Sequence, residues 1–179
     1  YLIDGIELVK LNSTAEIDIT ALHGSSESVF PSTGGFTYVP ATPLVMWKNH
    51  ATLADYKVDF STSPVAVKYK DYTSVIGVTN GLMVMPQATT LGEVYSKTDV
   101  EDKGIPLAKV ATPVPGKEDS FYIKVSYKAV QGTGDEIFYY AGSATSSKDM
   151  YIPVKDQTDA GKGLTFEIGR QYTFRLTFG

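Results

Sequence analysis

Two histidines are the first residues of this chain to test for acid–base or metal chemistry. Neither His23 nor His50 has the spacing of a metal ligand pair or stands beside a serine in a nucleophile-elbow pattern. Isolated histidines of this kind are ordinary loop residues far more often than functional ones. We therefore assign neither of them a catalytic role.

Clustered carboxylates are the second test, because a glycosidase needs two of them facing each other across a cleft. The clusters comprise Asp99, Glu101 and Asp102, and then Asp135 and Glu136. Both clusters lie in polar stretches that lack the apolar surroundings needed to shift a carboxyl pKa. We interpret them as solvated charges.

The segment "DQTDAGKG" spaces Asp156 and Asp159 in a glycine-containing loop. A calcium loop of the EF-hand type needs more oxygen ligands and a closing glutamate, so a turn between two strands explains the segment better. The glycine-rich "GSSES" and "STGG" lack the following helix on which phosphate sites depend. Cysteine is absent, which excludes disulfides and thiolate sites. We therefore expect no enzyme activity, no catalytic or metal-binding residues and no cofactor.

Trp47 is the only tryptophan of the chain. An exposed ring could serve as a platform for a sugar, but Trp47 follows Leu44, Val45 and Met46. Large aromatic residues dominate core packing. We favour burial of the ring over carbohydrate stacking.

Composition indicates one folded domain over residues 1–179. Apolar residues make up 42% of the chain, with 12 Tyr and 8 Phe, which is ample for a core. The net charge is −4, and the 16 basic residues form no run, so we expect neither nucleic acid nor an anionic membrane as a partner. No apolar run reaches membrane-spanning length, and the chain opens on Tyr1 without a signal-peptide pattern. We expect a processed chain or an excised domain, with any export signal or lipid anchor upstream.

Period-two alternation predicts two clear strands. In "FYIKVSYKAV" one face carries Phe121, Ile123, Val125 and Tyr127, and the other carries Lys124, Ser126 and Lys128. In "RQYTFRLTF" we expect Tyr172, Phe174, Leu176 and Phe178 in the core, with Thr173, Arg175 and Thr177 facing outward.

Weaker alternation predicts further strands. The alternating residues are Ile6 and Leu8; Ala15, Ile17 and Ile19; Tyr56, Val58 and Phe60; and Val65, Val67 and Tyr69. The best helix candidate, "TTLGEVYSKTDVEDKG", has a capping threonine but is interrupted by Gly92, so we expect a long loop with at most one helical turn. Many strands with few helices indicate an all-β chain, an antiparallel β-sandwich with Greek-key-like connections.

The stretch "GLMVMPQAT" places four large apolar residues directly before Pro86. A doubly buried strand and a short core helix share this pattern. Proline disfavours helical geometry in the residue before it and cannot donate a ladder hydrogen bond, which favours the strand. We expect a strand through Val84 that stops at Met85, with Gln87 starting a loop.

The order of these segments resembles the C-terminal domain of the fimbrillin-like proteins, the type V pilins of Bacteroidetes. The resemblance covers nearly the whole chain and rests on an apolar-Pro-Gln triplet, on a "V-x-Y" strand and on a terminal aromatic pattern. The corresponding residues are Val84, Pro86, Gln87, Val125, Tyr127, Phe166, Gly169, Tyr172 and Phe174, followed by Leu176 and Phe178. Phe166 stands where the family often has tryptophan.

The resemblance implies a transthyretin-like β-sandwich, the second domain of a two-domain exported lipoprotein. It also implies that subunits join into cell-surface fimbriae outside the outer membrane by strand exchange with other pilin subunits, and that they adhere to host or bacterial surface ligands. The main alternative is a carbohydrate-binding module or surface glycan-binding lipoprotein, since fold does not fix function. An enzyme is a distant third.

Strand exchange needs an extended segment with alternating apolar residues, and the two chain ends offer one. These are residues 1–11 and 170–179. The simpler alternative is that both ends complete the sheets of their own domain.

Overall fold

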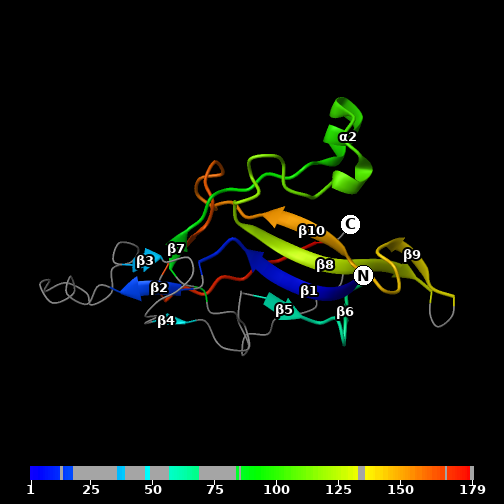
Figure 1. Ribbon diagram of the computed structural model, residues 1–179, viewed down its shortest axis with the longest axis horizontal. Coiled ribbons are helices and arrows are strands. Elements are labelled where there is room, and N and C mark those ends of the chain that lie inside the picture. The colour runs from blue at the N-terminus through cyan, green and yellow to red at the C-terminus, as the bar shows by residue number, and fades with distance from the viewer. Residues whose placement is uncertain are drawn as a thin grey trace, which may run out of the picture.

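The computed structural model describes residues 1–12, 14–17, 36–38, 47–48, 57–68, 84, 86–132, 136–167 and 169–177. Strands dominate these residues, which confirms the all-β prediction (Figure 1). The strands are β1 (Leu2–Val9), β2 (Thr14–Ile17), β3 (Phe36–Tyr38), β4 (Trp47–Lys48), β5 (Lys57–Asp59), β6 (Val65–Ala66), β7 (Gln87–Ala88), β8 (Tyr122–Gln131), β9 (Phe138–Ala141), β10 (Lys148–Pro153) and β11 (Thr165–Phe166); the helices are α2 (Lys97–Lys103) and the 3-10 helix η3 (Leu107–Lys109).

The strands form three sheets, and every ladder between them is antiparallel. The largest has the order β10-β8-β1-β5, with β6 also pairing with β1 and β9 also pairing with β8. A second sheet pairs β7 with β11, and a third has the order β3-β2-β4. Figure 1 shows the third sheet at the opposite end of the molecule from the β8–β9 hairpin.

Strand β8 forms the centre of the largest sheet, as its alternation predicts. Ile123 and Val125 are buried, and Tyr127 packs half-buried against the same core. Tyr122 points to the other face of the sheet and is nevertheless only 1% exposed. Its hydroxyl accepts a hydrogen bond from the Glu93 amide (3.1 Å) and lies 2.8 Å from the Lys117 carbonyl, so the loop at Glu93 and the segment just before β8 cover this end of the sheet.

Strand β1 lies between β8 on one side and β5 with β6 on the other. Ile6 pairs with Val125 and Leu8 with Ile123, so the apolar residues of both strands share one face. The register shifts between Ile3 and Gly5, which is a β-bulge that adds Asp4 to the strand. The N-terminal segment therefore completes the sheet of its own domain.

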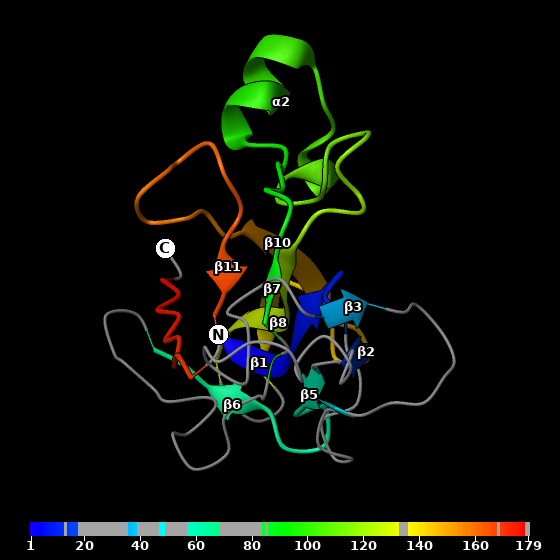
Figure 2. The same cartoon turned by 90° about the vertical axis from the view of Figure 1, so that its left-hand side faces the viewer.

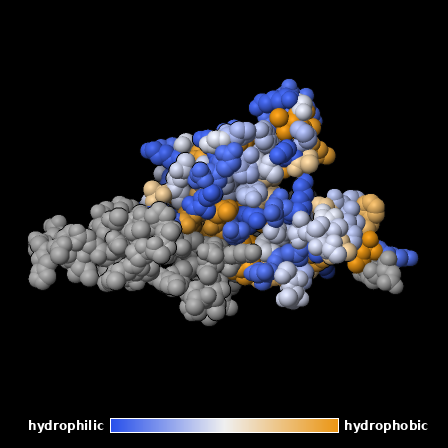
Figure 3. All heavy atoms as spheres, in the orientation of Figure 1, coloured by the Kyte–Doolittle hydropathy of each residue, from blue (hydrophilic) through white to orange (hydrophobic). Residues whose placement is uncertain are grey.

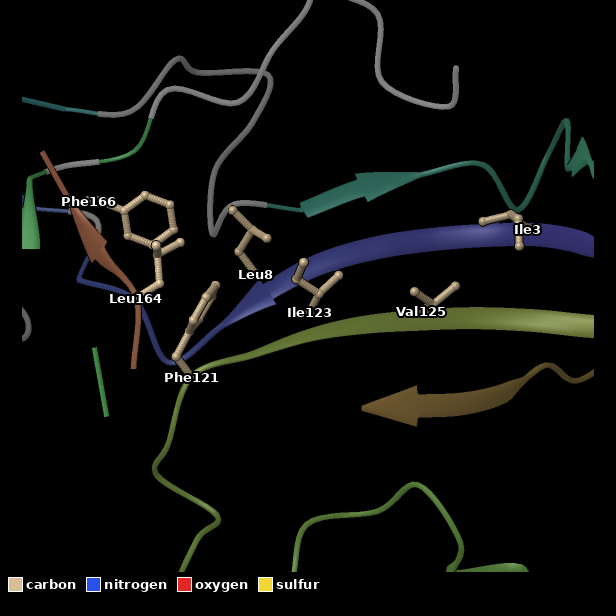
Figure 4. Close-up of a cluster of buried hydrophobic side chains, with 7 residues drawn as sticks. All are labelled: Ile3, Leu8, Phe121, Ile123, Val125, Leu164 and Phe166. Atoms are coloured by element: carbon tan, nitrogen blue, oxygen red, sulfur yellow. The ribbon is translucent and has the colours of Figure 1, made fainter. Parts of the chain in front are cut away.

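The core lies on one face of this sheet. Its buried members are Ile3, Leu8, Phe121, Ile123, Val125, Leu164 and Phe166 (Figure 4). Phe166 stacks edge-on against Phe121, with ring centroids 5.6 Å apart, and against Tyr172, at 5.1 Å. Burial of side chains of this size contributes about 1.5–3 kcal/mol each before entropy is counted.

The weaker strand predictions are met in part. Phe60 and Val67 belong to no strand, although both pack half-buried against the core. Ile6 and Leu8 lie in β1, Ala15 and Ile17 in β2, Val58 in β5 and Val65 in β6. Ile19, Tyr56 and Tyr69 lie outside the described residues. Trp47 pairs with Ala15 in a short strand, but the description does not include its side chain, so burial of the ring stays a prediction.

The segment around Pro86 differs from its prediction. Val84 is half-buried and belongs to no strand, so the doubly buried strand expected there is not seen. Met85 lies outside the described residues, and Gln87 begins β7 instead of a loop, pairing with Phe166 of β11. Gln87 is 4% exposed, and its carboxamide takes the place of a neighbouring strand by bonding to the backbone of Asn12. It accepts from the Asn12 amide and donates to the Asn12 carbonyl, both at 2.9 Å. The buried glutamine thus joins the end of β1 to β7.

The C-terminal segment is the second correction, because residues 170–177 are assigned to no strand. Tyr172 and Leu176 pack half-buried against the core, whereas Phe174 is 37% exposed and Phe178 lies outside the described residues. The chain turns at Gly169, whose φ of 70° is left-handed. The Tyr172 hydroxyl then donates to the Thr165 carbonyl of β11 (3.0 Å). Side chains therefore hold this segment where a ladder was expected.

The third correction is α2, a seven-residue helix where a loop with at most one turn was expected. No residue of α2 is buried, and Figure 2 shows the helix projecting away from the sheets. Its cap is Ser96, not the expected threonine. Ser96 and Asp99 form a reciprocal capping box, and Gly104 ends the helix with a left-handed φ of 63°. Lys103 Nζ pairs with Asp99 at 2.6 Å, so local contacts alone stabilise α2.

Replacing Gln87 with leucine should lower the free energy of unfolding by about 2 kcal/mol, because two backbone groups of Asn12 lose their buried partner. Urea denaturation measures this. Gln171→Leu is the matched control at an exposed position and should change stability by less than about 0.5 kcal/mol. Equal effects of the two variants would show that the Gln87–Asn12 contact contributes nothing.

Asp99 should titrate unusually low. The hydrogen bond from Lys103, followed by those from Ser96, lowers the pKa of Asp99 from 3.8 to about 2. Because the folded pKa is the lower one, the stabilisation of α2 is complete above pH 3.8 and is lost as the pH falls through about 2. Carbon-detected NMR of the Asp99 carboxyl checks the midpoint, and Lys103→Met should raise it. A wild-type midpoint near 3.8 would contradict the capping geometry.

Candidate functional site

The residues that the sequence singled out for strand pairing mostly lie in or around the core. Pro86, Gln87, Val125 and Phe166 are buried, and Val84, Tyr127, Tyr172 and Leu176 pack half-buried against the core. Gly169 and Phe174 are exposed, and Phe178 is outside the described residues. These positions shape the domain from within, so most of them cannot contact a partner directly.

The candidate residues for chemistry do not assemble into a site. His23, His50 and Asp135 lie outside the described residues. Within the described ranges, no group of three or more His, Cys, Asp or Glu side chains could hold a metal ion. Asp99 serves as the helix cap described above.

Asp156 and Asp159 organise a turn. The Asp156 carboxylate accepts from the Thr158 amide (2.7 Å) and the Asp159 amide (3.0 Å). Asp159 accepts from the Gly161 amide and pairs with Lys162 at 3.1 Å. Both carboxylates are therefore engaged within their own loop, as the turn interpretation predicts.

No helix among the described residues is both long enough and apolar enough to cross a membrane.

An open cleft of about 360 Å³ lies beside the loops that Tyr122 anchors. Leu91, Glu93, Lys117 and Lys155 are among its lining residues. Tyr122 packs directly on Gly92, where an added Cβ would lie 2.3 Å from the ring. Burial raises the pKa of Tyr122, so the phenol stays protonated as a hydrogen-bond donor to the loops. The cleft follows from this anchoring, and its ionisable lining residues are Glu93, Lys117 and Lys155.

The most exposed apolar surface lies on the β8–β9 hairpin. Of the five exposed large hydrophobic residues in the described part of the chain, three are here: Ile137 (40%), Phe138 (62%) and Tyr140 (68%). The rings of Phe138 and Tyr140 lie 5.0 Å apart at 71°, and the Tyr140 hydroxyl donates to Gln131. We call Gln131, Ile137, Phe138 and Tyr140 the hairpin surface. Figure 3 shows it as a projecting, partly hydrophobic end of the molecule.

Two glycines delimit strand β9. Gly132 (φ 95°) and Gly142 (φ 76°) both have left-handed backbone geometry. A Cβ on Gly132 would lie 2.0 Å from the Glu136 carbonyl, and one on Gly142 would lie 2.8 Å from the Ser146 carbonyl. The left-handed geometry and the nearby carbonyls therefore favour glycine at both positions.

The outer edge of β9 is open in the described structure. β9 pairs with Ala129, Val130 and Gln131 of β8 and with no other described strand. The pairing of β1 with β8 ends at Leu2 and Lys128, so the hairpin extends beyond the rest of the sheet. An unpaired edge of this kind is a template for another strand.

The neighbouring edge of β10 is protected. The Tyr151 amide, which points away from β8, donates to the Ala111 carbonyl at 2.9 Å. Pro153, at the end of β10, has no amide hydrogen to offer. The open and the covered edges lie next to each other, and only the open one carries exposed aromatic residues.

Sequence reasoning missed Phe138 and Tyr140. The signal was the run "IFYYAG", in which three aromatic residues precede a glycine. Alternation within that run places Phe138 and Tyr140 on one face and Tyr139 on the other, which the structure shows as exposed and half-buried residues. Without attention to this alternation, a run of aromatic residues indicates a buried segment.

Comparison with known proteins identifies no relative: no family model, no curated protein and no solved structure matches the chain.

The aromatic residues of the hairpin should contribute little to folding. Phe138→Ala should change the free energy of unfolding by less than about 1 kcal/mol, because its ring is already exposed to water. Phe121→Ala is the control within the core and should cost about 3–5 kcal/mol. A large loss for Phe138→Ala in thermal or urea denaturation would make the hairpin surface part of the core.

Proposed function

We propose that this protein is a structural or adhesive subunit of a cell-surface fimbria that joins other subunits by β-strand addition. The observation that carries the proposal is the open edge of β9 beside the exposed rings of Phe138 and Tyr140. The fold proposed with it is a transthyretin-like β-sandwich with Greek-key connections. The order of strand segments and their resemblance to fimbrillin-like proteins support the same function.

Strand addition explains why the two features occur together. A strand laid along β9 forms backbone hydrogen bonds with the open edge, and alternate side chains of that strand fall on the face of Phe138 and Tyr140. The backbone hydrogen bonds would give the added strand its affinity for β9. The rings of Phe138 and Tyr140 would favour a strand with an apolar side chain beside them. The proposed partners are therefore extended segments of other subunits.

The two chain ends differ in how much structure their release would disrupt. Residues 2–9 form β1, which pairs on both sides, so their release would dismantle the largest sheet. Residues 170–177 have a strand-like pattern but are assigned to no strand. We propose the C-terminal segment as the donated strand.

A carbohydrate-binding module is the second candidate, and the exposed rings favour it to a degree. A flat platform for a sugar needs coplanar rings, whereas Phe138 and Tyr140 are inclined by 71°. Only one of these rings could lie flat against a sugar face. The inclined pair fits the side chain of an added strand better.

Self-association tests the proposal. Sedimentation of the protein over a range of concentrations should show oligomers, and the double variant Phe138→Lys with Tyr140→Lys should weaken their association constant at least about tenfold, or about 1.4 kcal/mol. Charge on an edge strand opposes pairing. Leu107→Lys is the matched control, because Leu107 is 67% exposed but lies in η3, away from the hairpin.

Removing residues from Arg170 onward tests the donor. A truncated subunit that still folds should lose its oligomers, and an excess of a peptide of residues 170–179 should bind its β9 edge without restoring them. The same peptide should dissociate the oligomers of the wild-type protein. Equal association of wild type, hairpin variant and Leu107→Lys would contradict the acceptor edge. Glycan binding by a monomer, lost in the hairpin variant, would favour the carbohydrate-binding alternative.

A further inference from the structure

The polar face of the largest sheet contains an enclosed carboxylate and amine. The β-bulge at Asp4 brings its carboxylate to Lys128 of β8, with 3.5 Å between Asp4 Oδ2 and Lys128 Nζ. Their side chains are 7% and 17% exposed, respectively. Ser147, just before β10, donates its hydroxyl to the same Oδ2. Bulges commonly re-aim a side chain in this way.

The side chains of Asp4 and Lys128 offer more hydrogen-bonding groups than their surroundings satisfy. Asp4 Oδ1 is buried and has no hydrogen-bond partner in the described structure. Lys128 Nζ carries three N–H donors, and its two neighbouring acceptors are Asp4 Oδ2 and the Ala144 carbonyl at 3.3 Å. A buried carboxylate oxygen without a partner is costly, so this arrangement calls for an explanation.

We propose that Asp4 and Lys128 condense into an intramolecular amide that joins β1 to β8 covalently. An amide has one carbonyl oxygen and one N–H, and the site offers one partner for each. The Ser147 hydroxyl donates to the carbonyl, and the Ala144 carbonyl accepts from the N–H. The oxygen without a partner, Oδ1, is the one that leaves.

The reaction needs no oxidant, reductant or co-reactant. One ammonium proton passes to Asp4 Oδ1, and the neutral amine attacks Cγ to form the N–C bond. Negative charge develops on Oδ2, where the Ser147 hydroxyl stabilises it. A second proton passes from nitrogen to Oδ1, the Cγ–Oδ1 bond breaks, and water departs. An ammonium and a carboxylate thus become a neutral amide plus one water, with charge and atoms conserved.

Enclosure and positioning supply the driving force for this pair in particular. Fixing the two groups in contact replaces a bimolecular step by an intramolecular one. An amide also removes two charges that are costly to keep buried. The stem of Lys128 passes close to Gly142, where an added Cβ would lie 3.1 Å from Lys128 Cγ.

Lys124 lies on the same face of β8 as Lys128, two alternations earlier in the strand, and also pairs with carboxylates. Its surroundings differ from those of Lys128. Lys124 pairs with Glu7 at 3.5 Å and with Asp149 at 3.3 Å, but these side chains are 24–43% exposed. Water can solvate both partners, so nothing favours their condensation. Burial opposes the charge on Lys124, but the carboxylate of Asp149 outweighs it and the pKa of Lys124 is raised, which keeps the amine protonated and non-nucleophilic.

Intact-mass spectrometry of the folded wild-type protein tests the proposal. The mass should fall below the sequence mass by one water molecule, and protease digestion should yield one branched peptide containing both Asp4 and Lys128. Lys128→Arg keeps the positive charge but removes the nucleophilic amine, so its mass should equal its sequence mass. Lys124→Arg is the matched control and should still lose one water.

The time course separates this reaction from dehydration of Asp4 on its own. Asp4 precedes Gly5, and an Asp-Gly pair can lose water by closing on the next backbone nitrogen. That product would appear in Lys128→Arg as well and would give no branched peptide. Protein recovered from inclusion bodies in denaturant, which has never folded, should show the full mass and lose water only on folding, more slowly in Ser147→Ala. Wild-type folded protein that keeps its full sequence mass overturns the proposal, as does a water loss shared equally with Lys128→Arg.

Discussion

The antiparallel pairing of β1 with β8 is the contact on which the rest of the structure depends. One face of this pair supplies most of the core, through Ile3, Leu8, Ile123 and Val125. The other face carries the charged row of Glu7, Lys124 and Asp149 and the enclosed pair of Asp4 and Lys128. Every other strand of the largest sheet pairs with β1 or β8.

The sequence predicts this pair well because period two encodes which side of a strand is buried. It does not predict what covers the opposite side. Tyr122 is buried because its hydroxyl meets the loop at Glu93, which is distant along the chain, as well as the Lys117 carbonyl of the segment just before β8. The C-terminal segment alternates as regularly as β8, but a strand also needs a partner ladder, which no local pattern specifies. The prediction that Gln87 starts a loop was wrong for a related reason, since its hydrogen-bonding partner Asn12 lies far away in sequence.

The candidate site was harder to predict than the fold. Most of the described motif residues lie in or against the core, because apolar and aromatic motifs mainly reflect packing, whereas Gly169 and Phe174 are exposed. The hairpin surface was missed because Phe138 and Tyr140 have the residue types of a core, and only the position of β9 beyond the end of β1 leaves them exposed. The capping box formed by Ser96 and Asp99 could have been recognised from the sequence and would have predicted α2.

We propose that the outer edge of β9 accepts a strand from another subunit. Amide hydrogen exchange, resolved to single residues and compared between the monomeric and the assembled protein, distinguishes this edge from the others. Strand addition should slow exchange in residues 138–141 and leave β10 unchanged, because the β10 edge is already covered at Tyr151. Unchanged exchange in residues 138–141 on assembly, with new protection elsewhere, would rule out β9 as the acceptor edge.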